Sequence, residues 1–159
     1  MGNSGKAMSD GGIKTIAVNK KARHRFHIED TIEAGLVLLG SEVKSLRQGR
    51  LSIAEGYVRL EHGEAWLVDV HIPPYEQANQ QNHEPLRARK LLLHKKEIQR
   101  LIGKISRQGY TLVPMRLYFK QGKAKLELGL GRGKKQHDKR QDQKASDARR
   151  EMDRARKHR

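Results

Sequence analysis

Segments of alternating apolar and polar residues run through most of the first 130 positions of the chain. In residues 123–131 alanine or leucine occupies every second position, which is typical of a half-buried strand. A similar alternation begins at Phe26, and residues 33–40 form a largely apolar run of strand length that ends in glycine. We therefore expect strands that begin near residues 26 and 123, and a buried strand over residues 33–40.

Two further stretches have the pattern of β-hairpins. Residues 56–72 form two alternating segments around His62 and Gly63, a residue pair that suits a tight turn. Residues 110–119 are joined to the strand at 123 through Gln121 and Gly122, which predicts a second hairpin.

Helical spacing occurs in two places. Residues 41–47 are expected to form a short helix that Ser41 caps and Gly49 ends. A second helix is expected to end at Gly109, with a core face made of Ile98, Leu101, Ile102 and Ile105. Residues 73–85 are polar and bounded by proline, so we expect a mobile loop there.

These elements predict a mainly β fold. About six strands, two or three short helices and hairpin connections favour an OB-fold-like six-stranded antiparallel barrel. We expect residues 1–12 to be a disordered arm, residues 13–132 to be the barrel and residues 133–159 to be a basic tail.

Charge narrows the class of partner. The chain has 34 Lys and Arg residues against 18 Asp and Glu residues, a net charge of +16 in 159 residues, so we expect a polyanion partner. There is no cysteine and no apolar run long enough to span a membrane, which favours a cytoplasmic location. The chain has only seven aromatic residues, and we interpret Tyr57 and Trp66 as core or cross-strand side chains rather than platforms for bases.

The tail has too few apolar side chains to form a core. Its apolar residues beyond the glycines are Ala145, Ala148, Met152 and Ala155, at helical spacing. We expect the tail to be disordered when free and helical when an anionic channel holds it, because ordering a residue costs about 1–2 kcal/mol. The alternative is a tail that only adds solubility or nonspecific charge.

The sequence contains no complete motif for phosphate binding, dinucleotide binding, metal binding or catalysis. A phosphate-binding loop would need glycine at Leu128 and Ser or Thr at Lys135, and a dinucleotide motif would need glycine or alanine at Lys134. His24 and His27 are expected on opposite faces of a strand, so we predict no metal site and no cofactor. His137 next to Asp138 could form an acid–base pair, but no pocket is expected there, and we predict no enzymatic activity.

The sequence leaves the partners of several charged residues open. Glu33 could pair with a nearby Lys or Arg, or it could accept hydrogen bonds from base donors. The basic residues 19–25 could be a solvated cluster or an RNA contact, and those of residues 87–91 could lie along a groove.

Five short segments, in order along the chain, carry a specific combination of residues: 19–24 (NKKARH), 33–35 (EAG), 40–47 (GSEVKSLR), 89–93 (RKLLL) and 133–140 (GKKQHDKR). In this combination the chain resembles the SmpB family, the SsrA-binding (tmRNA-binding) proteins of bacterial trans-translation. The likeness covers residues 13–159.

The resemblance implies an OB-fold barrel that binds the tRNA-like domain of tmRNA near its elbow. It also implies residues for each contact. The tmRNA-facing candidates are Asn19, Lys20, Arg23, Glu33, Lys44, Arg47, Lys90, Leu91 and Lys125. The ribosome-facing candidates are His24, Gly133, Lys134, Lys135, His137, Asp138, Lys139 and Arg140.

As partners, the resemblance implies tmRNA, the stalled 70S ribosome with its 16S rRNA decoding centre, and elongation factor Tu through tmRNA. The tail would enter the decoding centre and the mRNA channel, and the protein would act as a monomer that makes or breaks no bond. Two other classes stay open from the residues alone: a permanent ribosomal or assembly protein, and a ribonuclease. Membrane association is disfavoured because the tail lacks a large apolar face.

Overall fold

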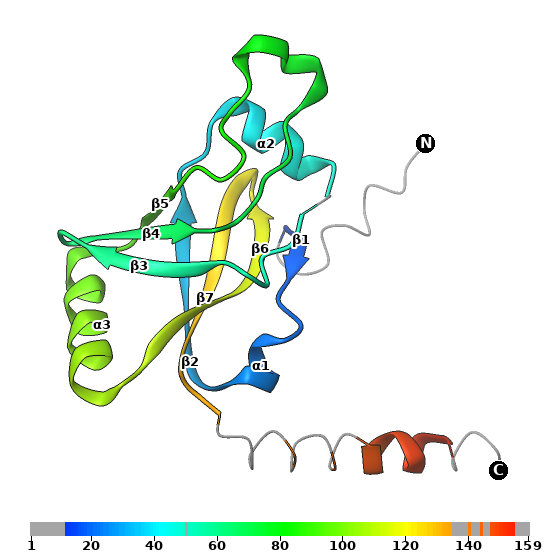
Figure 1. Ribbon diagram of the computed structural model, residues 1–159, viewed down its shortest axis with the longest axis vertical. Coiled ribbons are helices and arrows are strands. Elements are labelled where there is room, and N and C mark those ends of the chain that lie inside the picture. The colour runs from blue at the N-terminus through cyan, green and yellow to red at the C-terminus, as the bar shows by residue number, and fades with distance from the viewer. Residues whose placement is uncertain (1–11, 50, 135–139, 141–143, 145–146, 155–159) are drawn as a thin grey trace.

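Seven strands form one antiparallel sheet in the computed structural model, which describes residues 12–49, 51–134, 140, 144 and 147–154. The strands are β1 (Ile13–Val18), β2 (Phe26–Leu36), β3 (Tyr57–Glu61), β4 (Glu64–Val68), β5 (Arg89–Leu92), β6 (Thr111–Lys120) and β7 (Lys123–Gly133). They pair in the order β1-β6-β7-β2-β5-β4-β3 (Figure 1).

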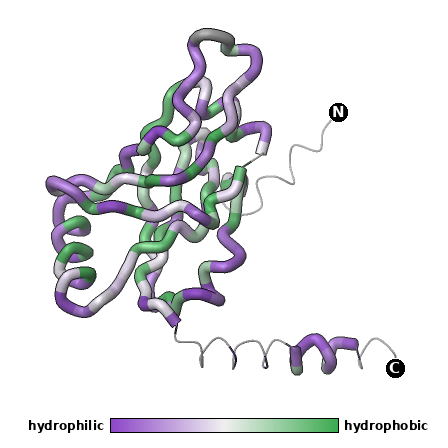
Figure 2. Tube along the Cα trace, viewed as in Figure 1, coloured by the Kyte–Doolittle hydropathy of each residue, from purple (hydrophilic) through white to green (hydrophobic). Residues whose placement is uncertain are grey.

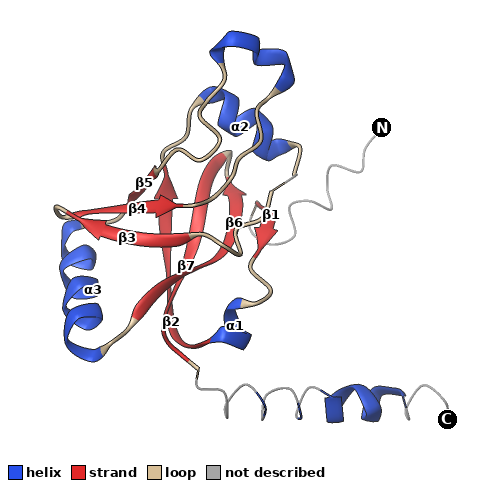
Figure 3. Ribbon diagram, in the orientation of Figure 1, coloured by secondary structure: helices blue, strands red, loops and turns tan. Residues whose placement is uncertain are grey.

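Helices lie at both ends of this sheet. They are α1 (Ala22–Arg25), α2 (Gly40–Arg47), the 3-10 helix η2 (Glu76–Gln81) and α3 (Lys95–Gln108). Figure 3 shows α2 near one end of β2 and α1 near the other end. Residues 147–154 are helical and exposed, and the interpretation that the tail folds only when bound stays a prediction.

The predicted mainly β, antiparallel fold is confirmed, but in place of the predicted OB-fold-like six-stranded barrel the structure has a curled sheet of seven strands. Its outer strands are β1 and β3, and β3 curls round to lie near β6. The sequence interpretation missed β1 because the pairing of β1 with β6 shifts register between Thr15 and Ala17. Such a bulge interrupts the alternation on which the prediction of a strand depends.

Both predicted hairpins are confirmed. His62 and Gly63 have φ values of 53° and 74°, and Gln121 and Gly122 have φ values of 52° and 78°. Positive φ at both central residues is typical of the type I′ turn that matches strand twist. The separate strand predicted over residues 33–40 is instead the end of the longer β2, followed by α2.

The two predicted helices are present with local differences. Gly109, with φ 70°, ends α3 as expected, but Ile102 is 41% exposed and does not belong to the core face. Ser41 does not cap α2: the residue before the helix is Leu39, whose N–H donates to Glu42 Oε1 over 2.8 Å. The Ser41 hydroxyl is instead hydrogen-bonded to His83, within the segment predicted as a mobile loop.

The core lies inside the curl of the sheet. Leu126, Leu128 and Leu130 of β7 are at most 1% exposed and pack with Leu46 of α2 and Leu101 of α3. Figure 2 shows the hydrophobic positions gathered along the strands, while residues 147–154 are mostly hydrophilic. Burial of each such leucine contributes about 1.5–3 kcal/mol, so β7 is a central element of the fold.

None of the helices among the described residues has the length and apolar character needed to cross a membrane.

A buried ion pair joins α2 to β5. Arg89 Nε donates to Glu42 Oε2 over 2.6 Å, and both side chains are fully buried. Arg87 Nη2 donates to Glu42 Oε1 over 2.6 Å, and Arg89 Nη1 donates to the Val70 carbonyl over 2.6 Å. This network explains how two basic side chains of a segment predicted to line a groove instead turn inward.

The carboxyl group of Glu42 is held ionised. Burial alone would raise its pKa, but hydrogen bonds from Arg87, the Leu39 amide and Arg89 outweigh burial and lower the pKa. The folded state therefore releases this proton more readily than the unfolded chain does.

Substitution of Glu42 by Gln is expected to lower the free energy of unfolding by about 3–5 kcal/mol at pH 7, because Arg89 would remain charged and buried without its partner. The stabilisation from Glu42 is present above its ordinary pKa of 4.5 and is lost as pH falls through the lower folded-state value, so E42Q also flattens the acid limb of stability. Urea unfolding at several pH values measures both effects. The control is Glu64→Gln, which breaks the exposed Glu64–Lys90 pair (3.3 Å) and is expected to cost at most about 1 kcal/mol. An equal cost for the two variants would contradict the assignment.

Candidate nucleic-acid interface

One row of residues crosses three neighbouring strands of the sheet. Gly35 of β2 pairs with Lys125 on β7 and with Leu92 on β5. Glu33, two residues before Gly35, and Lys125 line a hollow of about 360 Å³ that extends to the start of α3. The structure therefore brings together two of the residues predicted to face tmRNA.

Glu33 has two partners in this region. The Tyr118 hydroxyl donates to Glu33 Oε2, and Lys120 Nζ lies 3.5 Å from the same oxygen. The hydrogen bond from Tyr118 lowers the pKa of Glu33, and the charge of Lys120 lowers it further against the opposing effect of burial. The ion-pair interpretation of Glu33 is confirmed, while contact with base donors stays a prediction.

The basic side chains of α2, and Lys90 on β5, are exposed or partly exposed, whereas Arg89 is buried. Lys44 Nζ lies 5.7 Å from the centre of the Tyr75 ring, and Arg47 lies 5.2 Å from that of Phe119. Cations held over rings in this way keep their charge available to solvent and to phosphate. Lys90 points outward from β5 and pairs with Glu64.

Leu91 requires a correction. It is only 2% exposed and belongs to the core, so it is not placed to contact RNA directly. Leu92 is 55% exposed and lines the same hollow as Glu33. Because side chains alternate along a strand, the inward position of Arg89 places Leu91 inward and Leu92 outward, and sequence reasoning missed this register.

In the segment 19–24, the burial of Asn19 and the position of His24 differ from the sequence interpretation. Asn19 is 7% exposed, and its Nδ2 donates to the Pro114 carbonyl over 2.9 Å, which fixes the start of α1 on β6. Lys20, Arg23 and His24 are exposed, with Arg23 and His24 on α1. His24 therefore does not share a strand with His27, which lies on β2.

The predicted tmRNA-facing residues do not form one patch. Lys44 and Arg47 lie on α2, whereas Lys20 and Arg23 lie at α1, near the opposite end of β2 (Figure 1). An RNA that contacts all of them would have to follow the length of the sheet.

Among the described residues, no group of three or more His, Asp or Glu side chains is placed to hold a metal ion.

The sheet holds the start of the tail. Gly133 is still part of β7 and pairs with Phe26, and the Lys134 amide donates to the Arg25 carbonyl over 2.8 Å. Arg140 is helical and exposed. The predicted ribosome-facing residues Lys135, His137, Asp138 and Lys139 lie outside the described residues.

Two residues that sequence reasoning missed anchor this end of β7. The Arg132 guanidinium lies 4.5 Å from the centre of the Tyr110 ring. The Tyr110 hydroxyl donates to Glu29 Oε2 over 2.5 Å, and this hydrogen bond raises the pKa of Tyr110. Tyr110 and Glu29 are 81 positions apart, and Arg132 lies on another strand than Tyr110's neighbours in sequence, so no local pattern indicated these contacts.

The chain matches a family model described as SmpB protein over residues 16–158. It is 56% identical over 154 residues to the SsrA-binding protein of Roseiflexus castenholzii, a match that covers 96% of this chain and 98% of that one. It is 54% identical over 147 residues to the SsrA-binding protein of Lysinibacillus sphaericus, covering 92% of this chain and 95% of the relative.

A solved structure described as "tmRNA-SmpB: a journey to the center of the bacterial ribosome" has a similar fold. Its chain is 47% identical to this one, with a TM-score of 0.62, and the match covers 79% of this chain and 86% of that chain.

Gly131→Ala is expected to destabilise the protein by about 2 kcal/mol or more, because a Cβ there would collide with the His27 carbonyl on β2. Gly133→Ala is the matched control, since a Cβ at Gly133 meets nothing within 4 Å. Thermal unfolding of both variants measures the difference. If the two variants melt together, the close approach of β7 to β2 at Gly131 is not a requirement of the fold.

Tyr118→Phe is expected to raise the pKa of Glu33 toward its ordinary value of 4.5, because the largest stabilising contact to the carboxylate is lost. Lys120→Gln should raise the pKa by a smaller amount. Carboxyl chemical shifts of Glu33, followed against pH by NMR, measure both. An unchanged pKa in Tyr118→Phe would show that the hydroxyl does not stabilise the ionised form.

Proposed function

The chain belongs to the SmpB protein family, and we propose that it is an SsrA-binding protein that binds the tRNA-like domain of tmRNA and delivers it to stalled ribosomes in trans-translation. The observation that carries this proposal is the extent of the family match, which runs from β1 to the end of the tail. A chain that shared only the β-sheet domain with this family would not match over residues 16–158.

The chemistry of the surface supports binding to a folded RNA. A net charge of +16 favours a partner whose phosphates release counterions when the protein binds. Exposed cations on α1 and α2 are separated along the sheet, which suits contact with the shape of an RNA rather than with one short sequence. The function requires no chemical step, and we assign no catalytic residue.

The tail is the proposed contact with the ribosome. In this proposal, residues 133–159 enter the decoding centre and the empty mRNA channel, where Lys134, Lys135, Lys139 and Arg140 contact phosphates of 16S rRNA. Residues 147–154 form an exposed helix, which supports a helical form of the bound tail. This helix carries three Arg and three acidic residues, so the positive charge in this proposal comes mainly from residues 134–140. His24 on α1, outside the tail, is also proposed to face the ribosome.

The remaining partners follow from the same role. We propose that elongation factor Tu acts through tmRNA, that the protein functions as a monomer, and that it works in the cytoplasm, where ribosomes translate. A permanent ribosomal component would use a similar surface but would not distinguish the tRNA-like domain of tmRNA from bulk tRNA.

The test is binding of the full chain to the tRNA-like domain of tmRNA, titrated with salt and challenged with excess bulk tRNA. Binding is expected to resist the competitor. Lys125→Gln is expected to weaken binding several-fold and to reduce the salt slope by about one phosphate contact. The control Lys14→Gln removes an equal charge from the edge strand β1 and is expected to bind as the wild type does.

Equal competition by bulk tRNA would contradict the proposal and favour a general polyanion binder. If Lys14→Gln and Lys125→Gln weakened binding equally, the interface would not be centred on the face that carries Glu33 and Lys125.

A further inference from the structure

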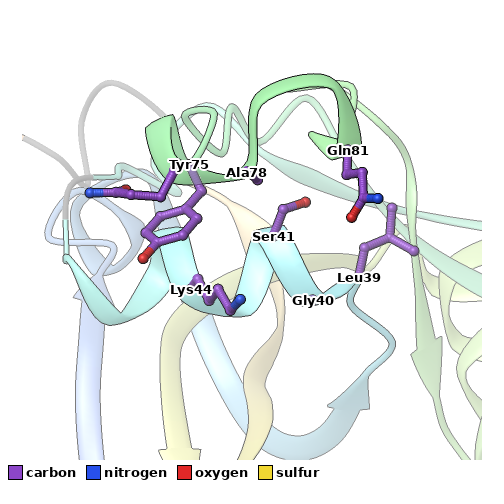
Figure 4. Close-up of a pocket in the computed structure, with 8 residues that line it drawn as sticks. Leu39, Gly40, Ser41, Lys44, Tyr75, Ala78 and Gln81 are labelled. Atoms are coloured by element: carbon purple, nitrogen blue, oxygen red, sulfur yellow. The ribbon is translucent and has the colours of Figure 1, made fainter.

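A groove separates α2 from the segment that contains η2 (Figure 4). It has a volume of about 570 Å³. Its lining is Leu39, Gly40, Ser41 and Lys44 on one side and Tyr75, Gln77, Ala78 and Gln81 on the other. Figure 4 shows Tyr75 and Gln81 reaching from the η2 segment toward α2, which carries Ser41 and Lys44. Lys44 and Tyr75, whose contact is described above among the cations of α2, both line this space.

Hydrogen bonds hold both walls of the groove. The Tyr75 amide donates to Asn82 Oδ1 over 2.8 Å, and Asn82 Nδ2 donates to the Tyr75 carbonyl over 2.7 Å. On the other wall, Ser41 Oγ lies 2.8 Å from His83 Nδ1, and the other ring nitrogen of His83 lies 2.8 Å from the Ile72 carbonyl. The Ser45 hydroxyl donates to the Pro73 carbonyl over 2.6 Å. The groove is therefore built into the fold and does not need a ligand to form.

The lining has a distinct chemistry. One cation (Lys44), one aromatic ring (Tyr75) and the amides of Gln77 and Gln81 face the space, and no carboxylate lines it. In contrast, Glu33 and Glu97 line the hollow beside Lys125, and Glu64 lines the one beside α3. A lining with a positive charge and no acid favours an anionic ligand.

We propose that this groove binds one unpaired nucleotide of the RNA partner. The aromatic ring of Tyr75 provides a surface for a base, Lys44 contacts the adjacent phosphate, and the glutamine amides can donate to or accept from the edges of the base. This inference rests on the proposed function, because it assigns a subsite for the RNA that the protein is proposed to bind.

The size of the groove favours a single nucleotide over a duplex or a protein helix. A space of about 570 Å³ lies in the range of small-ligand sites and accommodates a base with its sugar. A duplex presents its bases inside and would offer only its backbone to a concave site. A protein helix would be expected to meet a longer and more apolar surface than one ring and one exposed leucine, Leu39.

The experiment fills the groove without disturbing the fold. Gly40 lines the groove, and a Cβ built there meets nothing within 4 Å, so Gly40→Leu adds bulk to open space. Gly103 in α3 is the matched control, because a Cβ there also meets nothing within 4 Å and Gly103 lies on a different helix. The probe is the tRNA-like domain of tmRNA, and thermal unfolding verifies that both variants are folded.

Gly40→Leu is expected to weaken binding about ten-fold, and Gly103→Leu is expected to bind as the wild type does. Tyr75→Ala should cause a similar loss, whereas Tyr75→Phe should retain binding because it keeps the ring. Chemical probing of the RNA should show one unpaired nucleotide that the wild type protects and that Gly40→Leu leaves reactive.

If the wild type binds selectively but Gly40→Leu and Tyr75→Ala bind equally well, the groove inference is wrong and the proposed function stands. If these variants keep RNA binding but lose activity on ribosomes, the groove takes a protein partner and the inference is also wrong. If the wild type itself does not prefer this RNA, both the inference and the proposed function fail.

Discussion

The buried pair of Glu42 and Arg89 is the constraint on which one end of the molecule depends. Two ionised groups that are fully removed from solvent stabilise a fold only when each charge is matched and hydrogen-bonded. Here the carboxylate accepts from Arg87, Arg89 and the Leu39 amide, and Arg89 also donates to the carbonyls of Val70 and Pro85. The pair thus fixes α2 against β5 and against the segment after β4. The exposed cations of α2 and the groove opposite η2 take their positions from it.

A second set of contacts fixes the other end of the sheet. Asn19 holds the start of α1 on β6, the Lys134 amide bonds to Arg25, and Arg132 packs on Tyr110. The tail therefore leaves from an ordered strand end beside α1, while the α2 end carries a separate group of cations. A protein with charged surfaces at two ends of one rigid sheet suits an adaptor that contacts two large anionic partners at once.

Sequence patterns correctly predicted the features that depend on residues close together in the chain. The two type I′ hairpins, the end of α3 at Gly109 and the alternation of β7 all depend on residues close in sequence, and each was predicted correctly. The strand β1 was missed because a bulge interrupts its alternation. The register of β5 was missed because residues 91 and 92 are both leucine, so the sequence does not show which of them faces the core. The inward turn of Arg89 depends on Glu42, 47 positions away, so composition alone suggested a basic groove where the structure has an ion pair. The resemblance to a known family supplied the function, which neither charge nor periodicity could specify.

The most direct test of the central claim is a reconstituted translation reaction in which ribosomes stall on an mRNA that lacks a stop codon. With alanyl-tmRNA and elongation factor Tu present, the account predicts that the nascent peptide acquires the tag encoded by tmRNA only when this protein is added. A chain that lacks the tail is expected to bind tmRNA. In the same reaction, however, it should leave the peptide untagged. Equal tagging with and without the protein would contradict the account.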